Sequence, residues 1–256
     1  MRCWLILFIL MAGSLSGCMH EGETTQVMCT DEDSPEDCGV GELIVDKAVD
    51  ECPTPAENQS GRGVGEGQLI LLIDDCARGL NGTWADFSLS SHLDENWNGT
   101  PENASNGSDS PWIMIQFMSP DCSHCWNAAD DMSIFHENYS EQVTFLTMAV
   151  NFSSSDSFNA TREEVAAFQD KSSYFGCYYE TKDCQDRPGD PHDWLYIDDR
   201  DQYWMYSFQS SGTPSFWIIQ PDGIVAWNQY QHNGDEGEDS EGITAALERF
   251  FGPLES

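Results

Sequence analysis

Two cysteines three positions apart lie where a predicted strand gives way to a predicted helix. The stretch 112–118, WIMIQFM, is almost continuously apolar, as expected for a central strand covered on both faces. Cys122 and Cys125 follow it, and apolar residues then recur about every three positions over 126–135, the spacing of one helical face. A thiol at the amino end of a helix faces unsatisfied N–H groups, which stabilise its thiolate. The spacing therefore makes Cys122 the candidate nucleophile and Cys125 the candidate resolving thiol.

Predicted strands and helices alternate through the rest of the chain. Apolar runs predict strands, a capping-box pattern from Thr161 to Glu164 predicts the start of a helix, and Pro-Asp-Gly predicts the turn of a hairpin. The predicted strands cover 68–73, 143–152, 194–199 and the hairpin 214–230, and the predicted helices cover 161–173, 202–208 and 241–252. This order predicts one α/β domain without internal repeats.

Two motifs in this order resemble the thioredoxin-like superfamily. The segment WIMIQFMSPDCSHC is similar to its strand–CxxC–helix unit, and SGTPSFWIIQPDGIVAW, about ninety residues later, is similar to its cis-proline segment and hairpin. The resemblance covers roughly residues 68–252 and implies a thioredoxin-like fold, with a central mixed sheet flanked by helices. It implies a thiol–disulfide oxidoreductase that acts on cysteine-containing protein clients without a cofactor. Pro214 would be the cis-proline beside the dithiol, and Thr213 would offer backbone hydrogen bonds to a substrate peptide.

The sequence departs from the family pattern around the dithiol. Asp121 replaces the tryptophan common before the first cysteine, Gln116 replaces the buried acid often found six residues earlier, and no proline follows in the active-site helix. The Cys-Ser-His-Cys centre, with His124 as a third candidate catalytic residue, resembles that of oxidising periplasmic disulfide-forming proteins. A cationic imidazole would make the disulfide more oxidising, whereas Asp121, Asp130 and Asp131 would raise the thiol pKa values. The direction of electron flow therefore stays open.

Other classes of protein share such a cysteine pair. The pair could be a structural disulfide, although a loop this short is a poor staple. It could belong to a copper or zinc carrier, but Cys122, Cys125 and His124 make at most a partial site, because zinc sites usually have four ligands. A thioredoxin-like module without redox activity could use the same groove for binding. We predict no metal site.

The first residues predict export. Arg2 precedes a short apolar run and small residues, which is the pattern of a signal peptide over residues 1–17. The sequence LSGC at 15–18 resembles a lipobox, which implies cleavage before Cys18 and lipid on its sulfur. An ordinary signal peptide or an uncleaved anchor would share parts of this pattern. The expected location is the outer face of the cytoplasmic membrane, reached through the lipid anchor, in the periplasm or at the cell surface.

The charge of the chain excludes one class of partner. Ten basic and 45 acidic residues give a formal net charge of −35, which argues against nucleic-acid binding.

We divide the exported part into an acidic tether at 18–66 and a thioredoxin-like domain at 67–256, with an insertion around 152–198. Eight Asn-x-Ser/Thr sequons suit a surface protein. They are Asn58, Asn81, Asn98, Asn103, Asn106, Asn138, Asn151 and Asn159.

The cysteine count indicates structural disulfides in addition to the dithiol. Of ten cysteines, Cys3 would leave with the signal peptide and Cys18 would be lipidated, so that eight remain. An even number in an exported chain suggests disulfides whose pairing the sequence does not fix. The candidates are Cys29, Cys38, Cys52, Cys76, Cys177 and Cys184. For Cys177 and Cys184, a second redox pair is the alternative. A membrane or soluble redox partner, not identifiable from the sequence, would exchange electrons with the dithiol.

Overall fold

The computed structural model describes residues 46–55, 58–99, 110–152, 158–232 and 240–254. The predictions for the signal peptide, for Cys18, for Cys29 and Cys38, and for two of the sequons, Asn103 and Asn106, lie outside these residues. Within the described ranges, no helix combines the length and the apolar character needed to cross a membrane.

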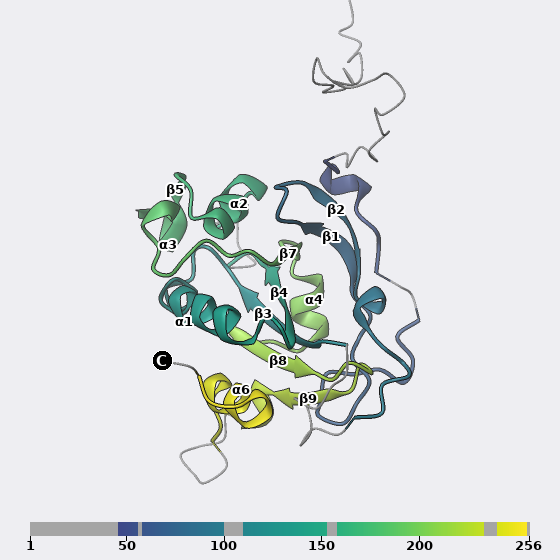
Figure 1. The fold of residues 1–256 in the computed structure, drawn as a ribbon. Helices are drawn as coiled ribbons and strands as arrows, with labels where there is room; N and C mark the ends of the chain where they lie inside the picture. The colour runs from purple at the N-terminus through teal and green to yellow at the C-terminus, as the bar shows by residue number, and fades with distance from the viewer. Residues whose placement is uncertain (1–45, 56–57, 100–109, 153–157, 233–239, 255–256) are drawn as a thin grey trace, which may run out of the picture. The chain divides into compact units, whose positions relative to one another are not determined.

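A mixed sheet organises the domain (Figure 1). Its seven strands, in the described part of the chain, have the order β2-β1-β7-β4-β3-β8-β9. Strands β3, β4 and β7 are parallel, whereas β8 is antiparallel to β3, β9 to β8, and β1 to both β7 and β2. The strands are β1 (Asp74–Arg78), β2 (Trp84–Ser88), β3 (Trp112–Met118), β4 (Val143–Ala149), β7 (Leu195–Asp198), β8 (Ser215–Ile219) and β9 (Val225–Asn228).

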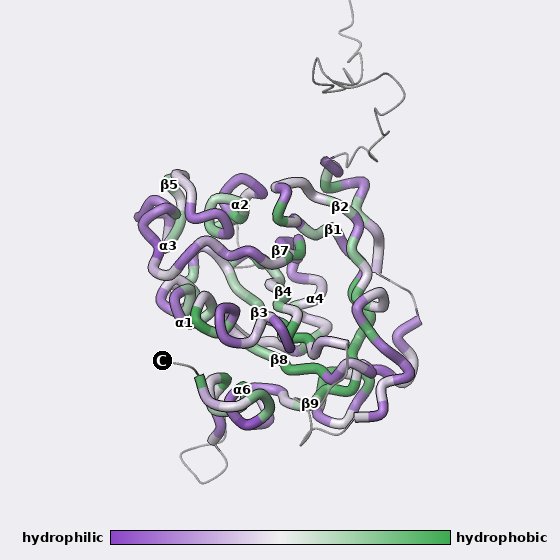
Figure 2. The backbone as a smooth tube through the Cα atoms, viewed as in Figure 1, coloured by the Kyte–Doolittle hydropathy of each residue, from purple (hydrophilic) through white to green (hydrophobic). Residues whose placement is uncertain are grey.

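Helices pack against both faces of this sheet, as the period-two alternation of its strands requires. On β3, Trp112 and Met114 join the core that contains α1, α2 and α6, whereas Ile113 and Ile115 join the core that contains α4. Figure 2 shows hydrophobic and hydrophilic residues succeeding one another along α1. The fold is therefore thioredoxin-like, with a mixed central sheet flanked by helices, as predicted. The helices are α1 (Ser123–Tyr139), α2 (Arg162–Asp170), α3 (Cys177–Glu180), α4 (Tyr203–Ser207), α5 (Gln229–His232) and α6 (Ile243–Phe251).

Shorter elements complete the domain. The predicted insertion contains α2, α3 and a small antiparallel sheet of β5 (Phe175–Gly176) and β6 (Lys182–Asp183), and it ends in β7. Single 3-10 turns are η1 (Val49–Glu51), η2 (Leu89–His92) and η4 (Cys184–Asp186).

The predicted strand at 68–73 is wrong. Only Leu69 in this run makes isolated bridges, to Arg62 and Ile224, and the regular strand begins afterwards at β1. The run is apolar because Ile70 and Ile73 are buried against the α4 side of the sheet. Its backbone bonds to side chains and loops, for example through Gln59, whose amide pairs with both the N–H and the C=O of Leu72 at 3.0 Å. A buried loop and a buried strand can both give an apolar run of six residues, so the run alone does not distinguish them.

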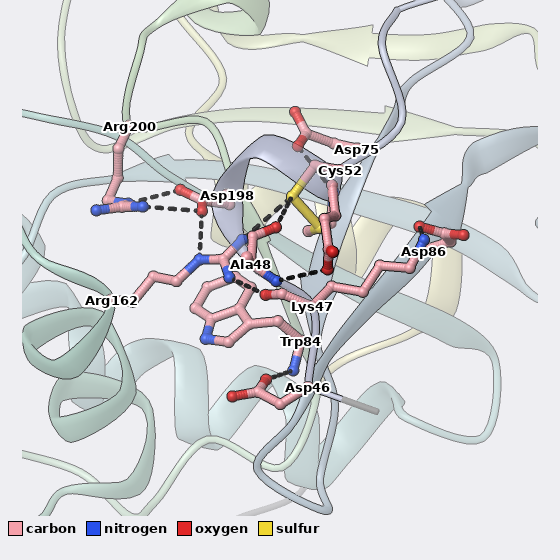
Figure 3. The surroundings of a disulfide bond; sticks show 12 residues. Asp46, Lys47, Ala48, Cys52, Asp75, Trp84, Asp86, Arg162, Asp198 and Arg200 are labelled. Atoms are coloured by element: carbon pink, nitrogen blue, oxygen red, sulfur yellow. Dashed lines mark hydrogen bonds and ion pairs between the residues drawn. A yellow bond between two sulfur atoms is a disulfide. The ribbon is translucent and has the colours of Figure 1, made fainter. Parts of the chain in front are cut away.

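Part of the segment predicted as a tether packs on the domain. Residues 46–55 and 58–66 pack on the domain, where a disulfide joins Cys52 to Cys76 of β1 (Figure 3). The guanidinium of Arg162 donates to the C=O of Lys47, to Asp198 Oδ2 at 2.8 Å and to Cys52 Sγ at 3.1 Å. It also lies 4.4 Å from the ring centroid of Trp84. The acidic composition of this segment gives no sign of these contacts, because composition indicates that the side chains are solvated and does not show what holds the backbone.

Replacing Arg162 by methionine should loosen this N-terminal segment. The aliphatic stem would still cover Trp84, but Asp198 would lose one of its two arginine partners and the C=O of Lys47 would lose its donor. Burial raises the pKa of Asp198, and hydrogen bonds from Arg200 and Arg162 outweigh it and lower the pKa below its usual 3.8. We expect a loss of about 1–2 kcal/mol of unfolding free energy, measured by urea denaturation.

The matched control is Arg200→Met, which also removes a partner of Asp198 but touches neither Lys47 nor Cys52. Only Arg162→Met should accelerate hydrogen exchange of the Lys47 amide, which donates to Trp84 O at 2.9 Å. Equal exchange in the two variants would contradict the clamping role of Arg162.

Candidate active site

Cys122 is the N-cap of α1. The turn after β3 gives it extended backbone angles, and its Sγ accepts a hydrogen bond from the backbone N–H of Cys125 at 3.4 Å. This is the geometry in which a side chain satisfies one of the free N–H groups of a helix start. Both cysteines are free thiols, and their exposed fractions, 2% for Cys122 and 1% for Cys125, do not distinguish them.

The two thiols differ in acidity. The hydrogen bond from the Cys125 side chain is the main cause that lowers the pKa of Cys122 from 9.0 to about 6, against the opposing effect of burial. Burial raises the pKa of Cys125 well above 9.0, and its hydrogen bond to Cys122 adds to the rise. At neutral pH the pair therefore holds one thiolate, on Cys122, and one thiol, on Cys125. Because the thiolate is the nucleophile, the arrangement gives the two sulfurs different chemical roles.

Alkylation of the reduced dithiol should follow this difference. We expect the rate of Cys122 modification by iodoacetamide to reach half its maximum near pH 6, about three units below an ordinary thiol, with Cys125 unmodified below pH 9. Peptide mass mapping separates the two sites from the cysteines in disulfides. The lowered pKa also stabilises the reduced fold above pH 9, and this contribution disappears as pH falls through 6. A midpoint near pH 9 for Cys122 would contradict the assignment.

Thr213 and Pro214 lie beside the dithiol. The antiparallel pairing of β3 with β8 sets Phe117 opposite Ser215, so that the residues before β8 meet those after β3. When Cys122 is protonated, its Sγ–H donates to the backbone C=O of Thr213 at 3.2 Å. The Thr213–Pro214 bond is cis, which confirms that prediction. Both residues are half-buried, and a peptide approaching Cys122 would meet the backbone of Thr213.

His124, predicted as a catalytic residue, and Gln116, which stands where the family often has a buried acid, also lie around the pair. His124 is exposed in the first turn of α1, between the two cysteines. Gln116 is buried in β3, where its Oε1 accepts a hydrogen bond from Thr147 Oγ1 at 3.3 Å. A neutral amide in this position gives the dithiol no proton acceptor there.

Two buried carboxyl groups, of Asp121 and Glu164, interact with each other next to Cys122. Asp121 is buried next to Cys122, and its Oδ1 accepts from the backbone N–H of Glu180 at 3.0 Å. Burial, and then the charge of Glu180, raise the pKa of Asp121. Glu164 of α2 is only 4% exposed, and its Oε1 lacks a hydrogen-bond partner among the described residues. Burial first, and then the charge of Asp121, raise the pKa of Glu164 to about 8.

The sequence signalled Glu164 only as part of a capping box. Thr161 Oγ1 does accept from the backbone N–H of Glu164 at 3.1 Å, so that half of the box is present. Nothing in the local pattern shows that the carboxyl group is also buried near Asp121, because this depends on how α2 and α3 pack against the end of β3.

A turn of the insertion covers residues 119–122, the loop between β3 and α1, which we call the dithiol loop. Cys177 and Cys184, both buried, form a disulfide, and the turn between them bonds to the loop before Cys122. The backbone N–H of Tyr178 donates to Pro120 O, and that of Tyr179 to Asp121 O, both at 3.0 Å. The sequence pattern assigned this segment to a loop-rich insertion and gave no position for it over the site. The sequence signal available for this turn was the cysteine pair Cys177 and Cys184, which encloses two adjacent tyrosines.

Metal-ligating side chains do not gather into a site in the part of the chain that the structure describes. No group of three or more His, Cys, Asp or Glu side chains is arranged there to hold a metal ion.

Comparisons with known proteins give similarities of fold. No protein-family model matches the chain, and no curated protein matches it in sequence. Among solved structures, the thioredoxin domain of a thiol-disulfide oxidoreductase from Bacteroides vulgatus is 14% identical, with a TM-score of 0.40, covering 70% of this chain and 94% of that one. A secreted Mycobacterium tuberculosis disulfide oxidoreductase is 17% identical, with a TM-score of 0.36, covering 59% and 78%.

A third solved structure, the reduced 2-Cys peroxiredoxin of Plasmodium vivax, is 11% identical, with a TM-score of 0.43, covering 63% of this chain and 82% of that one. Likeness at these TM-scores does not assign a function to the chain. The description of the fold as thioredoxin-like rests on the strand order and on the site at the end of β3.

Proposed function

We propose that this chain is a thiol–disulfide oxidoreductase that acts on cysteine-containing protein clients through Cys122 and Cys125. One observation carries the proposal: Cys122 caps α1 as a low-pKa thiol, while its partner one turn later is buried with a raised pKa. A structural pair has no need of this asymmetry, whereas thiol exchange needs one nucleophilic and one resolving sulfur.

The exchange proceeds in two balanced steps. The Cys122 thiolate attacks one sulfur of a client disulfide, the client S–S bond breaks, and the other client sulfur leaves as a thiolate. Cys125 then loses its proton to that departing thiolate and attacks the Cys122 sulfur, which releases the second client thiolate and forms the Cys122–Cys125 disulfide. The client gains two electrons and the dithiol loses them. The reverse sequence oxidises a client dithiol.

Two client assays test the proposal in both directions. The oxidised protein is incubated with a reduced, unfolded disulfide protein, and the reduced protein with an oxidised one, and thiols are counted by mass. We expect stoichiometric transfer of two electrons in at least one direction. A protein whose Cys122 and Cys125 remain unchanged in both assays would overturn the proposal. Tight binding of Cu⁺ or Zn²⁺ with loss of two titratable thiols would then support a metal carrier, and client binding without exchange would support a redox-inactive module.

The proposed location is outside the cytoplasm, with the chain held at the outer face of the cytoplasmic membrane by lipid on Cys18. The signal-like start and the LSGC sequence support this, as does a buried disulfide such as Cys177–Cys184, which suits an oxidising compartment. Electrons would be exchanged there with a membrane or soluble redox partner. Intact-mass analysis of the membrane-extracted protein should show a chain beginning at Cys18 with added acyl mass. A product that begins elsewhere and carries no lipid would contradict the anchor.

A further inference from the structure

Three aromatic rings meet beside the dithiol loop. Phe152 follows β4, Phe158 precedes α2 and Tyr179 lies in α3, so that separate segments supply them. Their ring centroids are 5.3 Å apart for Phe152 and Tyr179, 5.8 Å for Phe158 and Tyr179, and 5.9 Å for the two phenylalanines, all edge-to-face. Phe152 is 36% exposed and Tyr179 38% exposed. We refer to these three residues as the aromatic cluster.

The cluster is continuous with the active site. The hydroxyl of Tyr179 lies 3.1 Å from the Oγ of Ser123, the residue after Cys122, and its backbone N–H bonds to Asp121 O. Strands β3 and β4 are parallel neighbours, so that the dithiol after β3 and Phe152 after β4 emerge at the same edge of the sheet. Figure 1 shows α3, which carries Tyr179, beside α1. A chain bound at Cys122 therefore has the aromatic cluster on one side and Thr213 on the other.

The backbone that presents these rings is unusual. Tyr178, Tyr179 and Glu180 have φ values of 55°, 56° and 57°, and Phe158 has a φ of 63°. Bulky side chains rarely adopt the left-handed region, and such residues gather at ligand-binding sites, where the surrounding structure holds them in place. Here the Cys177–Cys184 disulfide and the hydrogen bonds to the dithiol loop hold the turn. Partly exposed rings so constrained lose little freedom when a ligand covers them.

We propose that the aromatic cluster is a docking surface for clients, and that it selects polypeptides in which a large aliphatic or aromatic side chain lies a few residues from the reactive cysteine. This rests on the proposed function, because that function brings an extended chain to Cys122. An extended chain advances about 3.3 Å per residue, so that a side chain two to four residues from the client cysteine reaches the cluster. Burying an apolar side chain against rings already clustered removes apolar surface of both partners from water.

The test uses short peptides joined as symmetrical disulfide dimers, with Leu or Ser placed two to four residues from the cysteine. The reduced full-length protein reduces each dimer, and quenching followed by mass analysis gives the rate. The test variant is Phe152→Ser/Phe158→Asn, since asparagine accepts the left-handed backbone of position 158. The matched control is Leu80→Ser, which removes an exposed apolar side chain from the β1–β2 turn, at the opposite edge of the sheet. Glutathione disulfide serves as a small substrate that does not reach the cluster.

We expect the unmodified protein and Leu80→Ser to reduce the Leu peptide about tenfold faster than the Ser peptide, equivalent to about 1.4 kcal/mol. The Phe152→Ser/Phe158→Asn variant should lose this preference while keeping its rate with glutathione disulfide. A missing preference in the unmodified protein, or one that persists in the variant, would overturn the inference and leave the oxidoreductase intact.

A second measurement separates the surface from the chemistry. The Cys122→Ala/Cys125→Ala protein is titrated with fluorescent peptides in which serine replaces the cysteine. Tighter binding of the Leu peptide, abolished by Phe152→Ser/Phe158→Asn, would support the docking surface even if the dithiol proved inert with glutathione disulfide. Equal binding of the Leu and Ser peptides would overturn it.

Discussion

A Cys122→Ser variant should lose thiol–disulfide exchange, with a rate reduced on the order of a thousandfold or more. Serine at this position cannot supply a thiolate, and the buried Cys125, whose pKa is raised well above 9.0, cannot take its place at neutral pH. A Cys125→Ser variant keeps the nucleophile but has no sulfur to resolve the intermediate. It should therefore accumulate disulfides between Cys122 and clients or glutathione, visible by intact mass.

The two serine variants are matched controls for each other, because each removes one sulfur from the same pair and leaves the Cys52–Cys76 and Cys177–Cys184 disulfides in place. Folding is checked by comparing their urea denaturation with that of the reduced protein. Equal rates of mixed-disulfide trapping by Cys122→Ser and Cys125→Ser would contradict the assigned roles.

Glu164→Gln should make the protein more stable in alkaline solution. The pKa of Glu164 is about 8 in the folded protein and 4.5 without the fold. The folded state therefore binds a proton more tightly than the unfolded state, and its stability falls as pH rises from 4.5 through 8. Glutamine keeps the shape and does not ionise. At about 1.4 kcal/mol per unit of pKa, we expect the variant to gain about 2–4 kcal/mol over the unmodified protein at pH 8.5 and little at pH 5.

Urea denaturation at the two pH values measures this gain. Glu163→Gln is the matched control, since Glu163 is the exposed neighbour in α2 and its replacement changes the net charge equally. Titration of Cys122 contributes to both proteins alike and cancels in the difference. If Glu163→Gln gave the same gain, or if the gain of Glu164→Gln were equal at pH 5 and 8.5, the burial of the Glu164 carboxyl group would not be its cause.

The elements carrying the chemistry were the most predictable from sequence. The apolar run of β3 is buried on both faces, and a strand followed by Cys-x-x-Cys and an amphipathic helix leaves few alternatives for the position of Cys122. The hairpin of β8 and β9 was marked by its turn residues. By contrast, the apolar run at 68–73 was predicted as a strand and is a buried loop, since hydrophobicity reports burial without the backbone pairing that makes a strand.

The contacts that surround the dithiol were not predictable. Asp121 and Glu164 are 43 positions apart in the sequence, and their interaction depends on the packing of α2 and α3. Tyr179 reaches Ser123 because three consecutive residues adopt left-handed backbone conformations, which no propensity favours for tyrosine. Likewise, Arg162 attaches the 46–52 segment to the domain through contacts more than a hundred residues apart in sequence, to Lys47 and Cys52. Tertiary packing determines such contacts, and local sequence patterns do not encode them.

The reduction potential of the Cys122–Cys125 couple tests the central claim most directly. The protein is equilibrated in glutathione buffers of graded ratio, quenched with acid, and its two thiols are counted by peptide mass mapping. An exchanging dithiol should give one two-electron transition at roughly −270 to −120 mV, the range of thioredoxin-like redox centres. A transition below about −300 mV would mark a structural disulfide, and the absence of any Cys122–Cys125 disulfide would exclude a redox couple. Either result would contradict the proposed oxidoreductase.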